Sequence, residues 1–272
     1  KLAVMDLKLS ISTCPNDTFM FDALVHGRID TSGYRFQLCM EDIQQLNRHI
    51  LDGEPDVSKI SYAVYPRIAD RYRILSAGSA LGRGNGPLLV SRHKIYPDEV
   101  SDVRIAVPGI YTTANFLLNF AFGEVKERRE YLFSDIAEAV LSGEMDAGVL
   151  IHEERFSYAQ KGLSLVSDLG EVWERKTGLP IPLGAIVVRR ELEERVQRDI
   201  DSLLRESIIF AMNNPSASYD FVKRYARELS DTVIRRHIEM FVNNFSVDIG
   251  EEGRKAVRTL FRENGFESDN CF

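Results

Sequence analysis

Short apolar segments alternate with segments of helical periodicity along most of this chain of 272 residues. This alternation is typical of a parallel or mixed sheet covered by helices, because parallel neighbouring strands need a long crossover connection that is usually a helix. The sequence therefore predicts an α/β fold. A chain of this length has room for one large domain or for two lobes.

The expected elements form two series that are followed by a helical end. The first series has helices at 17–25 and 43–52 and strands at 7–12, 34–40, 56–60, 73–76 and 88–91. A further helix is expected near Ser61, where Pro66 leaves its bounds open. The second series has strands at 103–107 and 147–151 and helices at 113–122 and 134–142. Residues 180–188 are expected to be extended, and from Glu191 onward the pattern is helical, including 231–242.

Composition and charge exclude several classes of protein. The net charge of -7 comes without a basic stripe, so nucleic acid is not an expected partner. No apolar run approaches the roughly 20 residues that span a bilayer, so integral membrane association is not expected. The 3 cysteines lack Cys-x-x-Cys spacing, which argues against a disulfide framework and a structural zinc site. The first residues lack the features of a secretory signal, so we expect a cytoplasmic protein with Met5 as a candidate native start.

Polar residues follow several of the expected strands, and in open α/β sheets ligands bind beyond the carboxyl ends of strands. After the first strand, Asn16 or Asp17 can cap the next helix, and a plain cap is an equally good interpretation of Asp17. At the end of the third strand, Lys59 and Ser61 flank Ile60 and offer an ammonium and a hydroxyl to an anion. Ser61 alone is more often a helix cap.

The junction at Thr112, Thr113 and Ala114 gives the strongest indication of an anion site. Two hydroxyls and the N–H groups of a helix start are expected to point one way there, and the helix dipole favours a carboxylate or a phosphate. Neither the G-x-G-x-x-G nor the Walker A spacing of nucleotide-binding loops occurs.

His152 directly follows the apolar strand 147–151, which places an imidazole at the mouth of the expected site. Imidazole titrates near neutral pH and suits proton abstraction, although a purely structural histidine is the competing interpretation. For the other histidines, surface roles are sufficient: His26, His49, His93 and His237. Cys14 has no histidine close in sequence, so a buried inert thiol is favoured over a nucleophile. No second ligand follows His152 at helical spacing, and no metal site is expected.

Several segments also carry a resemblance to a known family. They are Ser12 to Phe19, Ser58 to Tyr62, Ala80 to Leu88, Thr112 to Ala114, Ile151 to Arg155 and Thr177 to Gly184. Together, and in this order, they resemble the 1,4-dihydroxy-6-naphthoate synthases of the futalosine route to menaquinone. Thr13 departs from the pattern, since many relatives carry proline there.

The resemblance implies a two-lobed fold of the type II periplasmic-binding-protein kind, each lobe a mixed sheet flanked by helices. Lobe 1 is then 1–88 with 190–272, lobe 2 is 89–189, and the ligand cleft lies between them. It also implies a lyase without cofactor that converts cyclic dehypoxanthinyl futalosine, a small carboxylate, to 1,4-dihydroxy-6-naphthoate. By the same resemblance His152 is the proton acceptor, and the residues that contact substrate or line the cleft are Lys59, Ile60, Ser61, Thr112, Thr113, Ala114, Asn16 and Asp17.

Three alternatives to the synthase remain at this stage. A solute-binding protein could capture an anion without chemistry, since the fold itself does not determine catalysis. Chorismate dehydratase has a related fold, but segments 151–153 and 180–184 favour the synthase. A regulatory effector-binding domain would need a DNA-binding module, and no helix-turn-helix precedes residue 7. The sequence leaves the oligomeric state open.

Overall fold

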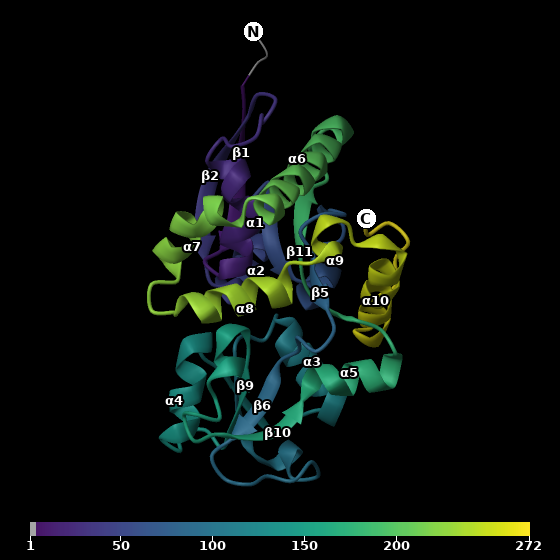
Figure 1. Cartoon of the computed structure of the whole chain (residues 1–272). Coiled ribbons are helices and arrows are strands. Elements are labelled where there is room, and N and C mark those ends of the chain that lie inside the picture. Colours follow the sequence, from purple (N-terminus) through teal and green to yellow (C-terminus); the bar gives the residue numbers. More distant parts are fainter. Residues whose placement is uncertain (1–3) are drawn as a thin grey trace.

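The computed structural model describes residues 4–272, which form two mixed sheets flanked by helices (Figure 1). The predicted α/β class is confirmed. Residues 1–3, with which the predicted first lobe begins, lie outside the described residues.

The first sheet has the strand order β2-β1-β3-β11-β4, with β5 paired to β11. Strands β1, β2 and β3 run parallel, and β11 runs antiparallel to β3, β4 and β5. The bounds are β1 (Met5–Ser12), β2 (Tyr34–Glu41), β3 (Val57–Ser61), β4 (Tyr72–Ile74), β5 (Ala80–Gly82) and β11 (Ile181–Arg189).

Helices cover both faces of this sheet, so the central strands β3 and β11 are almost wholly buried. Val57, Ile186 and Val188 pack in one core with α1 and α6, whereas Ile60 and Val187 pack in the other with α10. The helices are α1 (Pro15–Val25), α2 (Ile43–Asp52), α6 (Glu194–Asn213), α7 (Tyr219–Tyr225), α8 (Asp231–Phe241), α9 (Asn244–Val247) and α10 (Gly250–Glu263). The short 3-10 helices are η1 (Tyr62–Arg67), where Pro66 lies, and η5 (Pro215–Ser218).

The second sheet has the order β10-β6-β9-β7-β8 and occupies the other half of the molecule (Figure 1). Its strands are β6 (Leu88–Ser91), β7 (Arg104–Val107), β8 (Glu127–Glu130), β9 (Ala147–Leu150) and β10 (Ser164–Asp168). Its helices are η2 (Val100–Asp102), α3 (Thr113–Phe122), η3 (Phe133–Asp135), α4 (Ile136–Leu141), η4 (His152–Phe156) and α5 (Leu169–Thr177).

The chain changes sheet twice, between β5 and β6 and again between α5 and β11. The predicted lobe boundary near 89 lies close to the first of these points, whereas the one near 189 differs from the second, because β11 was assigned to the second lobe and yet pairs within the first sheet. The composition of this segment predicts an extended strand, but its partners are set by long-range packing. We propose 88–180 as the second lobe.

At the first crossing the backbone lies directly against the start of α5. A Cβ on Gly86 would stand 2.4 Å from the Cα of Gly170, and the Leu169 N–H donates to the Pro87 carbonyl at 3.0 Å. Backbone atoms cannot rotate away as a side chain can. Both positions therefore require glycine.

Candidate active site

One cavity is lined by residues from both sheets and from the loops between them. Its volume is about 680 Å³, which includes the space open to solvent at its mouth. Every predicted site residue lines it: Asn16, Asp17, Lys59, Ile60, Ser61, Thr112, Thr113, Ala114 and His152. The wall also contains Asn85, Arg155, Leu183, Gly184 and Phe241, for which no binding role was predicted.

The start of α1 differs from the prediction that Asn16 or Asp17 caps this helix. The helix begins at Pro15, and its N-cap is Cys14, which makes no side-chain cap hydrogen bond. Proline is favoured at the first helical position, because the N–H it lacks has no partner there in any case. Asn16 and Asp17 therefore lie in the first turn, and both line the cavity.

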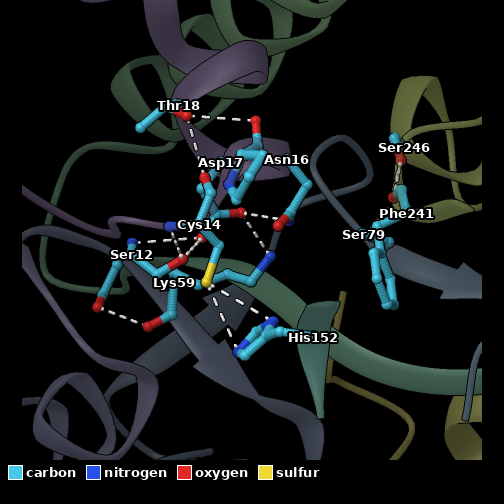
Figure 2. Close-up of polar contacts among 12 residues, drawn as sticks. Ser12, Cys14, Asn16, Asp17, Thr18, Lys59, Ser79, His152, Phe241 and Ser246 are labelled. Atoms are coloured by element: carbon cyan, nitrogen blue, oxygen red, sulfur yellow. Dashed lines mark hydrogen bonds and ion pairs between the residues drawn. The ribbon is translucent and has the colours of Figure 1, made fainter. Parts of the chain in front are cut away.

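The carboxylate of Asp17 is the centre of a buried polar network (Figure 2). It accepts hydrogen bonds from the N–H and hydroxyl of Ser12, at 3.2 and 2.6 Å, and from Asn16 Nδ2 at 2.9 Å. Lys59 Nζ donates to the same carboxylate at 2.8 Å, and the two side chains of this ion pair are 7% and 0% exposed. The Lys59 ammonium, which was predicted to face an anion, is thus already paired with the Asp17 carboxylate. The ammonium has further N–H donors.

The hydroxyls at the start of α3 are used within the protein. Thr112 is the N-cap: its Oγ1 accepts from the Asn115 N–H at 3.2 Å and donates to the Gly109 carbonyl at 2.7 Å. The Thr113 hydroxyl donates to the Leu183 carbonyl at 2.7 Å. The prediction that both hydroxyls point toward an anion is therefore wrong. The N–H groups in the first helical turn lack intrahelical partners, and those of Thr113 and Ala114 remain for a ligand.

Ser61 at the end of β3 is oriented by a neighbouring amide. Its N–H donates to Asn47 Oδ1 at 2.9 Å, and Asn47 Nδ2 donates to its Oγ at 2.9 Å. Because Oγ accepts this bond, the hydroxyl proton is available to an acceptor in the cavity. Ser61 is the N-cap of η1 but makes no side-chain cap hydrogen bond, so the plain-cap interpretation does not account for its hydroxyl.

His152 begins η4 with a φ of 54°, a left-handed conformation that is uncommon for residues other than glycine. Both of its ring nitrogens lie 3.6 Å from Cys14 Sγ, and Phe133 packs edge-on to the ring with centroids 5.0 Å apart. Burial lowers the pKa of His152 from 6.5 to about 4. The imidazole is therefore neutral near pH 7 and carries an unprotonated nitrogen that can accept a proton.

Cys14 is close to His152 in space, although the two are far apart in sequence (Figure 2). Burial raises the pKa of the Cys14 thiol, with the charge of Asp17 as a lesser cause. The thiol therefore stays protonated, and this favours a packing role over a nucleophile.

The surface role predicted for His237 is wrong, because this histidine is 0% exposed and lies beneath the site. Its ring stacks on that of His152, with centroids 5.8 Å apart and planes 18° apart. Ile234, His237 and Phe241 form the buried stripe of α8 at spacings of three and four. This periodicity is the sequence signal that could have placed His237 inside.

The hydrogen bonds of His237 determine its tautomer. Asn16 donates its Nδ2 to Asp17, so Asn16 Oδ1 must be the acceptor that His237 Nε2 meets at 3.0 Å. His237 Nε2 therefore carries a proton, and Nδ1 faces Glu153 Oε2 at 3.6 Å. Burial lowers the pKa of His237, so its ring is held neutral, and burial raises the pKa of Glu153.

Among residues 4–272 no group of three or more His, Cys, Asp or Glu side chains is placed to hold a metal ion. Within the same residues no helix is both long and apolar enough to cross a membrane. The cytoplasmic location expected from the sequence stays a prediction.

A family model described as menaquinone biosynthesis matches residues 7–264. A 1,4-dihydroxy-6-naphthoate synthase from Thermus thermophilus is 47% identical over 258 residues, which are 94% of this chain and 93% of the relative. The chain belongs to the 1,4-dihydroxy-6-naphthoate synthase family. A second relative of this name, from Streptomyces coelicolor, is 41% identical over 262 residues, with 93% and 91% covered. The predicted resemblance to this synthase family is confirmed.

Solved structures confirm the predicted fold of this synthase family member. A protein from Archaeoglobus fulgidus matches with a TM-score of 0.90 at 38% identity, covering 96% of this chain and 97% of that one. The alkanesulfonate-binding protein of Xanthomonas axonopodis matches with a TM-score of 0.69 at 12% identity, covering 100% and 97%. A Candida albicans protein with the generic periplasmic-binding-protein fold matches with a TM-score of 0.67 at 13% identity, covering 98% and 93%.

Proposed function

We propose that this protein is a lyase that converts cyclic dehypoxanthinyl futalosine to 1,4-dihydroxy-6-naphthoate without a cofactor, with His152 as the proton acceptor. The observation that carries the proposal is a partly buried imidazole on the wall of the cavity between the two sheets, whose lowered pKa keeps it neutral near pH 7. Relatives named for the same product, at 47% and 41% identity, support it.

The chemistry needs a base at the start. Carbon–carbon and carbon–oxygen bonds must break on the way to an aromatic naphthol, and proton removal begins that flow of electrons. The aromatic product supplies driving force, so a single imidazole suffices as the initiating base. The cavity wall holds the substrate in place and limits the access of water.

We place the substrate carboxylate at the start of α3. The N–H groups of Thr113 and Ala114 lie there at the positive end of the helix dipole, and the Ser61 hydroxyl can donate a further hydrogen bond. Lys59 adds a positive charge that Asp17 partly offsets. This assignment keeps the predicted residues but replaces the Thr113 hydroxyl with backbone donors.

The product formed from cyclic dehypoxanthinyl futalosine, identified by mass spectrometry, tests the function. We expect 1,4-dihydroxy-6-naphthoate from the purified protein alone. Loss of water from chorismate, with no reaction of the cyclic compound, would instead identify a chorismate dehydratase. Binding of the cyclic compound without any product would identify a solute-binding protein of the same fold.

A Ser61→Ala variant tests the carboxylate position. We expect KM to rise about 10-fold to 150-fold at nearly constant kcat, because one hydrogen bond to a charged group contributes about 1.5 to 3 kcal/mol. Steady-state kinetics measures both constants. Ser58→Ala is the matched control, since the Ser58 hydroxyl donates to the Lys59 carbonyl within the same strand and is not part of the cavity wall. An unchanged KM in Ser61→Ala, with the protein folded, would move the carboxylate elsewhere.

A further inference from the structure

Arg155 is a buried cation on the cavity wall whose N–H groups meet no oxygen at hydrogen-bond distance among residues 4–272. Its side chain is 11% exposed, and its nearest carboxylate oxygen is Asp168 Oδ2 at 3.6 Å. The other contact is with the sulfur of Met240 at 3.7 Å. A guanidinium has five N–H donors, and a ligand in the cavity can accept hydrogen bonds from those of Arg155. The N–H groups of Arg155 are thus donors without an oxygen acceptor among the described residues.

The neighbouring carboxylates do not form hydrogen bonds with the guanidinium of Arg155. Asp168 uses Oδ1 to cap α5, accepting from the N–H groups of Gly170 and Glu171 at 2.9 and 3.1 Å. Asp17, which also lines the cavity, is already paired with Lys59 at 2.8 Å. Of the charged side chains that line the cavity, Arg155 is therefore the one whose hydrogen bonds are least satisfied.

The position of Arg155 relative to His152 indicates what the N–H donors of Arg155 bind. Both residues belong to η4, at positions three apart in the chain. Both also line the same cavity. One ligand in this cavity can therefore contact both the guanidinium of Arg155 and the imidazole of His152.

We propose that Arg155 binds the substrate oxygen on which negative charge develops when His152 removes a proton. The inference rests on the proposed function. The unprotonated nitrogen of His152 takes the proton, the electron pair of the broken bond moves toward the oxygen, and the guanidinium donates N–H hydrogen bonds to it. The imidazole becomes an imidazolium. Arg155 keeps its own protons, because guanidinium is not deprotonated in proteins.

An Arg155→Met variant is the first test. Methionine keeps much of the apolar volume but has neither charge nor donors, and removing a donor to a developing oxyanion lowers kcat by about 100-fold to 1,000-fold. We expect a fall of that size with a much smaller change in KM, because the contact strengthens in the transition state. Undiminished kcat would overturn the inference.

Asp168→Asn is the matched control for a merely structural ion pair. Asparagine caps helices as well as aspartate does, so α5 keeps its cap while Arg155 loses its nearest carboxylate. We expect this variant to retain most of its kcat. A loss equal to that of Arg155→Met would mean that the ion pair, and not a substrate contact, explains the effect.

Chemical rescue separates a direct contact from a folding defect. Guanidinium chloride at low, non-denaturing concentration should restore part of the kcat of Arg155→Ala in proportion to its concentration, and sodium chloride at equal ionic strength should not. His152→Asn should not respond. Rescue supports the inference, and its absence in a folded variant that binds substrate overturns it. If the unmutated protein forms no product, the proposed function itself is overturned. This outcome distinguishes failure of the proposed function from failure of the role of Arg155.

Discussion

A His152→Asn variant is expected to lose about 100-fold to 10,000-fold in kcat, because removing a general base has this effect. Asparagine cannot take the proton, yet it tolerates the left-handed conformation at φ 54° better than most residues. We therefore expect a folded protein that binds substrate within about tenfold of the unmutated affinity. Product formation measures kcat, and a thermal-shift titration measures binding. His93→Asn on the exposed surface is the control. Near-normal kcat in folded His152→Asn would remove the base assignment.

The pH dependence of kcat/KM gives a second measure of the same group. Burial lowers the pKa of His152 to about 4, with Lys59 acting in the same direction and Asp17 opposing it. The unprotonated imidazole is then kept as the pH falls below 6.5. We expect the acid limb of the profile to reach half its height near pH 4, as long as circular dichroism shows a folded protein. A limb centred at the ordinary value of 6.5 would contradict a buried base.

A Lys59→Met variant is expected to lose about 3 to 5 kcal/mol in the free energy of unfolding. The substitution leaves the Asp17 carboxylate, which is 0% exposed, without its cation. Removing one partner of a buried ion pair is costly because the remaining charge has no compensation. Urea denaturation followed by circular dichroism measures the loss.

Two comparisons show whether the buried charge is the cause. In the double variant Asp17→Asn with Lys59→Met neither charge remains, and we expect most of the lost stability to return. Arg35→Met removes one partner of the surface pair with Asp6, whose side chains are 68% and 42% exposed, and should change stability far less. A double variant as unstable as Lys59→Met would show that packing, and not charge, dominates.

Strands with apolar runs could be predicted from the sequence, whereas polar strands could not. β1 and β9 lie almost where the alternation indicated, because most of their buried side chains are apolar. β8 consists of Glu-Arg-Arg-Glu and lies at the edge of its sheet, where one face and one edge meet water. β10 is also an edge strand and carries an irregular register, and neither it nor α5 was expected. β8 and β10 bury too little of their side chains to leave a periodic pattern.

The site could be located from the sequence, but the hydrogen bonds that each of its groups makes could not be predicted. Polar residues that follow apolar strands were predicted to converge, and they line one cavity. Which proton each hydroxyl donates depends on neighbours that are distant in the chain. The Thr113 hydroxyl bonds to Leu183, and His237 meets Asn16 from another part of the sequence. Such long-range pairs leave no local pattern.

The order of the strands bears on how this protein is made. β11 lies between β3 and β4, so the first sheet cannot be completed until residue 189 has been synthesised. The strands of the second sheet all lie within one continuous stretch, from Leu88 to Asp168. Domains fold as units while the chain leaves the ribosome. We therefore expect the second sheet to form first during translation. The amino-terminal strands of the first sheet cannot complete their pairing until β11 has been synthesised.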